Sequence, residues 1–235
     1  MKLRWECALI LAAGLMVPAW GTTPPKKPRT ILLSAGKQVP YSKAGDPAGA
    51  GPDETALRTR ALMVDGRVSE WTTGDAHDVT DRSFVVRRAL RINDQLPGEK
   101  QQSAHWVWQR GPWLLVDRIN GHVAVLKLPD YDPGVSQIAW FRDYAAYCGL
   151  TASSKSLYAV VAQVAIRKPL LTKKLSEYDA ADHSWPVCGP SDWQREPLRI
   201  TFHPTGKDAV SFDVVGGSAV LLEDGNDQPE STAKP

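Results

Sequence analysis

The 235-residue chain has little of the charge, and little of the apolar length, that nucleic-acid-binding and membrane-spanning proteins need. Its 28 Lys and Arg residues nearly balance 26 Asp and Glu residues, which gives a formal net charge of +2. That charge is too small to argue for binding to nucleic acid or to an anionic membrane. The apolar run Cys7–Val17 is 11 residues long, too short to span a bilayer.

The common catalytic signatures are also missing. The sequence contains no Gly-x-Ser-x-Gly, no His-Glu-x-x-His, no phosphate-cradling glycine loop and no dinucleotide fingerprint. Catalytic triads assemble from distant residues, so this lowers the odds of an enzyme without excluding one. We therefore predict no catalytic residue and no cofactor.

The first 21 residues have the pattern of a signal peptide. Lys2 and Arg4 precede the apolar run, and Ala19-Trp20-Gly21 places small residues at positions −3 and −1 of a cleavage site. A retained anchor is the alternative, for which the run is short. We predict a periplasmic or secreted protein with no transmembrane segment after cleavage.

Cysteine is scarce, with three in the chain, and cleavage would remove Cys7. The remaining pair, Cys148 and Cys188, predicts a disulfide, because an exported chain matures in an oxidising compartment. Two free thiols or a thiol nucleophile are the alternatives. Cys148 lies within an apolar predicted strand, which favours a buried or bridged cysteine over a reactive one.

Composition divides the rest of the chain into three parts. Residues 22–54 are rich in Pro and Gly and predict a flexible leader, with one short strand at 30–33. Residues 55–222 predict a single β domain. Residues 223–235 are polar and predict a disordered tail.

The densest strand-like sequence, 106–166, predicts five consecutive antiparallel strands. Asn120-Gly121 between two apolar runs is typical of a two-residue hairpin loop, which would pair Leu115 with Leu126. We predict an all-β fold of antiparallel meander sheets, arranged as a sandwich or as an incomplete propeller-like stack.

Four predicted strands in 136–175 resemble one blade of a β-propeller. Residues 135–150 and 197–215 share a plan of strand, tight turn and strand. A propeller needs at least about four blades of roughly 40 residues, and the sequence does not supply that phasing. The sequence segments 84–94 and 143–149 are similar to segments of exported bacterial proteins of unassigned function. This resemblance implies no activity.

Two groups of side chains are candidate sites. The predicted polar loop 74–81 places three carboxylates and an imidazole close together, so it could hold a divalent cation. Its candidate ligands are Asp75, His77, Asp78 and Asp81. The alternative is a solvated turn in which Asp78 or Asp81 caps backbone N–H groups.

Tryptophan is the most distinctive residue of the mature chain. Trp106 and Trp108 share one predicted strand face, and Arg87 and Arg91 share a face of the predicted strand 83–92. Indoles and guanidinium groups together could bind an acidic glycan or peptide. The alternative is indoles in a β core and arginines paired with carboxylates on neighbouring strands.

These observations favour a non-catalytic binding or scaffolding domain at the cell envelope. Its partner would be a glycan or a protein. The alternative is a hydrolase acting on an envelope or extracellular polymer, with the loop 74–81 supplying carboxylates or a metal.

Overall fold

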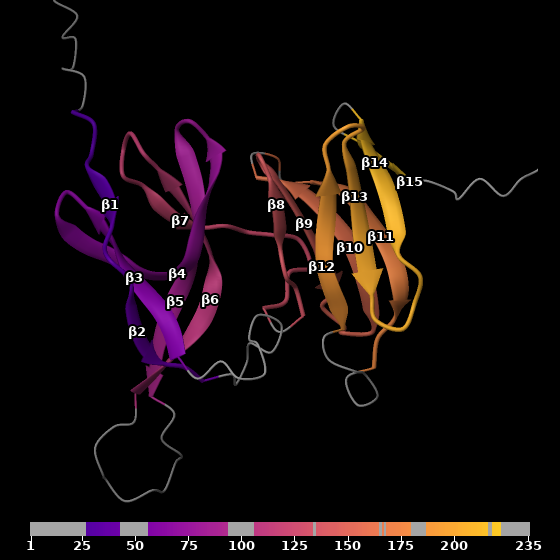
Figure 1. Ribbon diagram of the computed structural model, residues 1–235, viewed down its shortest axis with the longest axis horizontal. Coiled ribbons are helices and arrows are strands. Elements are labelled where there is room, and N and C mark those ends of the chain that lie inside the picture. The colour runs from indigo at the N-terminus through magenta and orange to yellow at the C-terminus, as the bar shows by residue number, and fades with distance from the viewer. Residues whose placement is uncertain are drawn as a thin grey trace, which may run out of the picture.

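The computed structural model describes residues 27–42, 56–93, 106–133, 135–164, 166, 168–179, 187–215 and 218–221. Within these ranges the chain forms strands and no helix, so no helical segment there is long and apolar enough to cross a membrane. The strands build three antiparallel sheets, as Figure 1 shows. The predicted all-β antiparallel fold is confirmed. The predicted signal peptide, the predicted tail and much of the predicted leader lie outside the described residues.

The first sheet has seven strands and forms one half of the molecule (Figure 1, indigo to pink). Its order is β1-β3-β4-β5-β6-β7, with β2 also paired to β3. The bounds are β1 Ile31–Leu33, β2 Lys37–Pro40, β3 Ala56–Val64, β4 Arg67–Thr80, β5 Ser83–Asn93, β6 Trp106–Asp117 and β7 Val123–Val125.

The first sheet curls, and each end of the segment 29–42 is hydrogen-bonded to the far side of the sheet. The Arg29 N–H donates to the carbonyl of Ile119 at one end, and the Ser42 N–H donates to the carbonyl of Trp108 at the other, both at 2.9 Å. The strand predicted at 30–33 is confirmed as β1, whereas β2 was not expected. The curl encloses an apolar cluster of Leu62, Phe84, Val86, Leu114 and Val116, against which Ile31, Leu33 and Val123 pack.

The second and third sheets each have four strands in sequential order. The second contains β8 Ala139–Phe141, β9 Tyr144–Leu150, β10 Ser156–Gln163 and β11 Pro169–Glu177, and the third contains β12 Cys188–Gln194, β13 Arg199–Pro204, β14 Val210–Val215 and β15 Ser218–Leu221. Side chains from both sheets form one buried core, which includes Val161, Ile200, Phe202 and Phe212. These two sheets therefore pack as a sandwich (Figure 1, orange and yellow).

The stretch 106–166 does hold five antiparallel strands, but they do not form one meander. β6 and β7 belong to the first sheet, and β8 to β10 belong to the second. The segment 126–138 between them crosses from one sheet to the other, and the carbonyl of Asp130 accepts a hydrogen bond from the Leu150 N–H at 2.9 Å. This crossing segment covers the outer face of the second sheet, where Leu128, Tyr131 and Ile138 pack on Tyr147 and its neighbours.

The hairpin register predicted from Asn120-Gly121 is wrong by two residues. Leu115 pairs with Ala124, so the turn spans four residues, 118–121. The Asp117 carboxylate stabilises this longer turn by accepting hydrogen bonds from the N–H groups of Ile119 and Asn120, at 2.8 and 3.2 Å. A slip of two leaves every side chain on its predicted face.

One further expectation on the first sheet is corrected, and β6 contains an irregularity. The polar loop predicted at 74–81 is instead strand, because β4 continues to Thr80 and pairs His77 with Val85. Gly111-Pro112 forms a β-bulge inside β6, opposite the point where pairing passes from Arg87 to Ala89. The bulge accommodates the proline without ending the strand.

Candidate functional site

One face of the first sheet gathers the predicted aromatic and basic residues. Arg91 of β5 lies directly opposite Trp108 of β6, and Asn93 lies opposite Trp106. Alternation along the strands puts Arg87 with Arg91, and Trp106 with Trp108, on this same face. We name these four residues and Trp71, which joins them from β4, the tryptophan–arginine face.

Four of the five side chains are in contact, as two pairs. The Arg91 guanidinium lies 4.7 Å from the ring centroid of Trp106, a cation–π distance. Trp71 meets Trp108 edge to face, with centroids 5.6 Å apart, although β5 lies between their strands. Thr72 pairs with Arg88, so Trp71 is level with the small residue Ala89, over which the two indoles can meet.

The face remains accessible even though its indoles touch. Trp71 is 43% exposed and Trp106 is 46% exposed. Buried indoles in a β core, the alternative weighed from the sequence, do not describe these two residues. Trp113 and Trp140 are instead partly buried and pack on each other, with centroids 5.2 Å apart.

A segment distant in the sequence fixes one border of the face. Tyr41 forms a bridge with Trp108, and the Arg110 guanidinium donates to the Tyr41 hydroxyl at 2.9 Å while lying 4.9 Å from its ring centroid. Tyr41 thereby positions Arg110 beside the tryptophans. Sequence reasoning missed Tyr41, because its proximity depends on the curl of the sheet. It did not place Trp71 at this site, because that position follows from the register of β4 against β5.

A hollow of about 360 Å³ continues from this face toward the second sheet. Arg87, Arg110 and Trp113 line it from the first sheet, and Gln137 and Ile138 line it from the crossing segment. The Arg87 Nε donates to the carbonyl of Gly111 at 3.1 Å, so the bulge orients this guanidinium. The hollow therefore combines positive charge, an indole and an amide.

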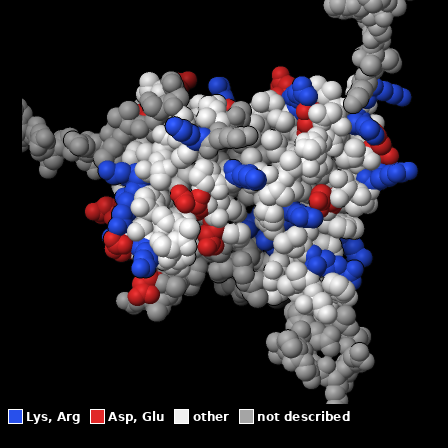
Figure 2. All heavy atoms as spheres, turned by 180° about the vertical axis from the view of Figure 1, so that it is seen from behind, with Lys and Arg blue, Asp and Glu red and all other residues white. Residues whose placement is uncertain are grey.

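Two other arginines, one on β5 and one on the turn before it, are paired with carboxylates. Arg88 contacts Glu70 at 2.9 Å, and Arg82 contacts Asp117 at 2.7 Å. The hydrogen bond from Arg82 lowers the pKa of Asp117 to about 2. These two arginines therefore interact with carboxylates of the neighbouring strands β6 and β4. Figure 2 shows basic and acidic side chains interspersed over the surface seen from behind.

The four residues predicted to bind a cation lie along β4 and its following turn. Asp75, Asp78 and Asp81 are exposed, and Asp78 contacts Arg118 at 2.6 Å. His77 instead stacks on Trp140, with centroids 5.5 Å apart, and its Nε2 lies 2.6 Å from the carbonyl oxygen of Arg142. Within the described ranges, no group of three or more His, Cys, Asp or Glu side chains is placed to hold a metal ion.

The predicted disulfide is present. Cys148 of β9 and Cys188 of β12 are bonded, with their Cα atoms 6.3 Å apart, inside the core shared by the second and third sheets. A buried disulfide is typical of proteins that mature in oxidising compartments, outside the bacterial cytoplasm.

Comparison with protein-family models, with curated proteins and with solved structures finds no match to this chain. The geometry of its own residues is therefore the basis for the functional argument.

Proposed function

We propose that this protein is an exported, non-catalytic binding module of the cell envelope, and that its tryptophan–arginine face holds an acidic glycan. The observation that carries the proposal is the exposure of Trp71 and Trp106 next to Arg91 on one sheet face. Export is supported by the signal-peptide pattern and by the disulfide.

The chemistry of the face suits a carboxylated sugar. Flat indole faces pack against the apolar side of a sugar ring, and a guanidinium group forms paired hydrogen bonds to a carboxylate. Arg91 stacks against one side of Trp106, which orients its N–H groups and leaves part of the indole exposed. Arg87 and Arg110 extend the positive surface into the neighbouring hollow. A neutral glycan would use the indoles but not the guanidinium groups.

The hydrolase alternative has no specific observation in its favour. It relied on the acidic residues at 75–81 lying together. Among the described residues they lie along a strand and its turn, with Asp78 paired to Arg118.

Binding to oligogalacturonate, a carboxylated glycan, tests the proposal against a neutral malto-oligosaccharide of the same length. Tryptophan fluorescence and calorimetry should show binding of the acidic glycan only, weakening as salt increases. Arg91→Gln and Trp106→Ala should each weaken binding about tenfold, equivalent to about 1.4 kcal/mol. Arg67→Gln, at an exposed arginine at the start of β4, is the control and should have no effect.

Equal binding of the neutral glycan would remove the role of the arginines. The glycan proposal fails if neither sugar binds at millimolar concentration. It also fails if the Arg91 and Trp106 variants bind as tightly as the unchanged protein.

A further inference from the structure

Among the described residues, no neighbouring strand uses the backbone hydrogen-bonding groups on the outer edge of β7. The N–H of Leu126 donates to the carbonyl of Trp113 at 2.8 Å, and the carbonyl of His122 accepts from the N–H of Asp117 at 2.9 Å. In an antiparallel pair, bonded and non-bonded residues alternate. The backbone groups of Val123 and Val125 therefore point away from β6. In the part of the chain that the structure describes, no strand pairs with this edge.

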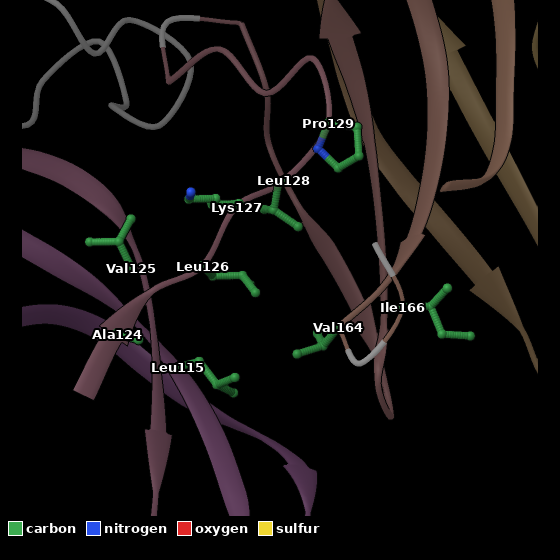
Figure 3. A pocket seen from close by; sticks show the side chains of 9 residues that line it. All are labelled: Leu115, Ala124, Val125, Leu126, Lys127, Leu128, Pro129, Val164 and Ile166. Atoms are coloured by element: carbon green, nitrogen blue, oxygen red, sulfur yellow. The ribbon is translucent and has the colours of Figure 1, made fainter. Parts of the chain in front are cut away.

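An open apolar groove of about 650 Å³ lies beside this edge. It is lined by Leu115, Ala124, Val125, Leu126, Lys127, Leu128, Pro129, Val164 and Ile166. Figure 3 shows Leu126 and Val164 pointing toward each other from opposite sides. Val125 and Ile166 are each 49% exposed, so apolar surface remains in contact with solvent at both sides.

We propose that this edge and groove bind an extended apolar peptide, which adds to the first sheet as a strand beside β7. Its backbone would pair with the free N–H and C=O groups of Val123 and Val125. Every second side chain would enter the groove, as in other complexes formed by strand addition. This surface is independent of the proposed glycan site, because Leu115 lies near the end of β6 and Trp106 lies at its start.

A peptide fits these observations better than an acyl chain or another small apolar ligand. An apolar ligand would cover the groove and leave the backbone groups of β7 without partners, at a cost in free energy. Lys127 is exposed beside the groove, so it favours a peptide that carries an acidic residue at one end.

The probe is a blocked hexapeptide in which valine alternates with threonine after an N-terminal aspartate. Added to isotope-labelled protein, it should shift the amide resonances of Val123 and Val125 and slow their hydrogen exchange. The expected affinity is weak, in the micromolar to millimolar range, because the contact area is small.

Two substitutions at Val125 separate backbone pairing from side-chain contact. Val125→Pro removes an N–H that β6 does not use, and proline is tolerated at a sheet edge. It should abolish binding, whereas Val125→Ala should keep it. Thermal unfolding of both variants establishes that the fold is retained.

A second pair of variants tests the groove without altering the strand. Ile166→Asp places a charge in the groove and should weaken binding at least tenfold. Val68→Asp, at a β4 residue that is 54% exposed and does not line the groove, is the control and should have no effect.

Absence of binding at millimolar peptide would overturn the proposal, and so would binding that neither Val125→Pro nor Ile166→Asp affects. A second copy of the chain is the other candidate occupant, and sedimentation of the unliganded protein tests it. A dimer that Val125→Pro dissociates would mean that a second copy of the chain, and not a separate peptide, occupies this edge.

Discussion

Trp140 of β8 packs edge to face against Trp113 of β6, with ring centroids 5.2 Å apart, across the junction between the first and second sheets. His77 stacks on the same indole from β4. The two halves of the molecule therefore share one aromatic cluster. Trp113 of this cluster also lines the hollow beside the tryptophan–arginine face.

We expect Trp140→Ala to lower the free energy of unfolding by about 3 kcal/mol, because it removes a large side chain from a packed junction. Trp140→Phe keeps a ring in place and removes a buried indole N–H that has no hydrogen-bond partner among the described residues, so its effect should be smaller. Urea denaturation followed by tryptophan fluorescence and by far-ultraviolet circular dichroism measures both. If the Ala and Phe variants are both as stable as the unchanged protein, the junction does not couple the two halves of the molecule.

Gly121 and Gly66 provide a matched test of a close approach. Both have positive φ, 69° and 76°, so a side chain at either is strained. A Cβ at Gly121 would lie 2.7 Å from Cγ1 of Val64, whereas a Cβ at Gly66 would meet no atom of the described residues within 4 Å.

We therefore expect Gly66→Ala to cost about 1 kcal/mol and Gly121→Ala about 2 to 3 kcal/mol, since the second adds overpacking to the backbone strain. Chemical denaturation of the two variants gives the difference. Equal losses would show that Val64 moves away freely, and that the contact between β3 and the turn 118–121 is loose.

The disulfide crosses between two sheets, so its removal should be costly. Cys148 and Cys188 are 40 residues apart in sequence, and closing such a loop contributes roughly 3–4 kcal/mol in the chain-entropy model. The double variant Cys148→Ala/Cys188→Ala should lose about that much stability in urea denaturation. Adding reductant to the unchanged protein during denaturation should reproduce the loss, and should leave the variant unaffected.

The fold class and most strand positions could be predicted from local sequence, because turns interrupt the strands at Asp65-Gly66 and at Arg142-Asp143. The sheet to which each strand belongs could not be predicted in this way. Nothing between β7 and β8 indicates that the chain changes sheets, since a polar segment with two prolines can equally be a hairpin loop or a crossing. The split follows from strand pairing, which joins β7 to β6 and β8 to β9.

The candidate site was predicted in part, for a similar reason. Strand alternation put Arg87 with Arg91 and Trp106 with Trp108, and the register of β5 against β6 brings these pairs together. Trp71 joins them through the register of a third strand. The prediction of a loop at 74–81 was wrong because its polar residues face solvent along a strand. The pairing of that strand with β5 has two irregularities. Composition alone does not distinguish such a strand from a loop.

Asp117, which stabilises the turn 118–121, should make the stability of the protein depend on pH. The hydrogen bond from Arg82 lowers its pKa to about 2, with help from the N–H groups of Ile119 and Asn120, while burial partly opposes the shift. Its value in the unfolded chain is about 3.9. Because the folded-state pKa is the lower one, the stabilisation is fully present above about pH 4 and is lost as pH falls through about 2.

Titration of the Asp117 carboxyl carbon by NMR should therefore show a midpoint near pH 2. Arg82→Gln should raise that midpoint toward the unfolded value, because it removes the largest cause of the shift. Asp117→Asn keeps an oxygen for the turn and loses the charge, so its stability deficit should shrink between about pH 4 and pH 2. A deficit that stays constant over this range would mean that the carboxylate acts only as a neutral cap, and that Arg82 contributes nothing through its charge.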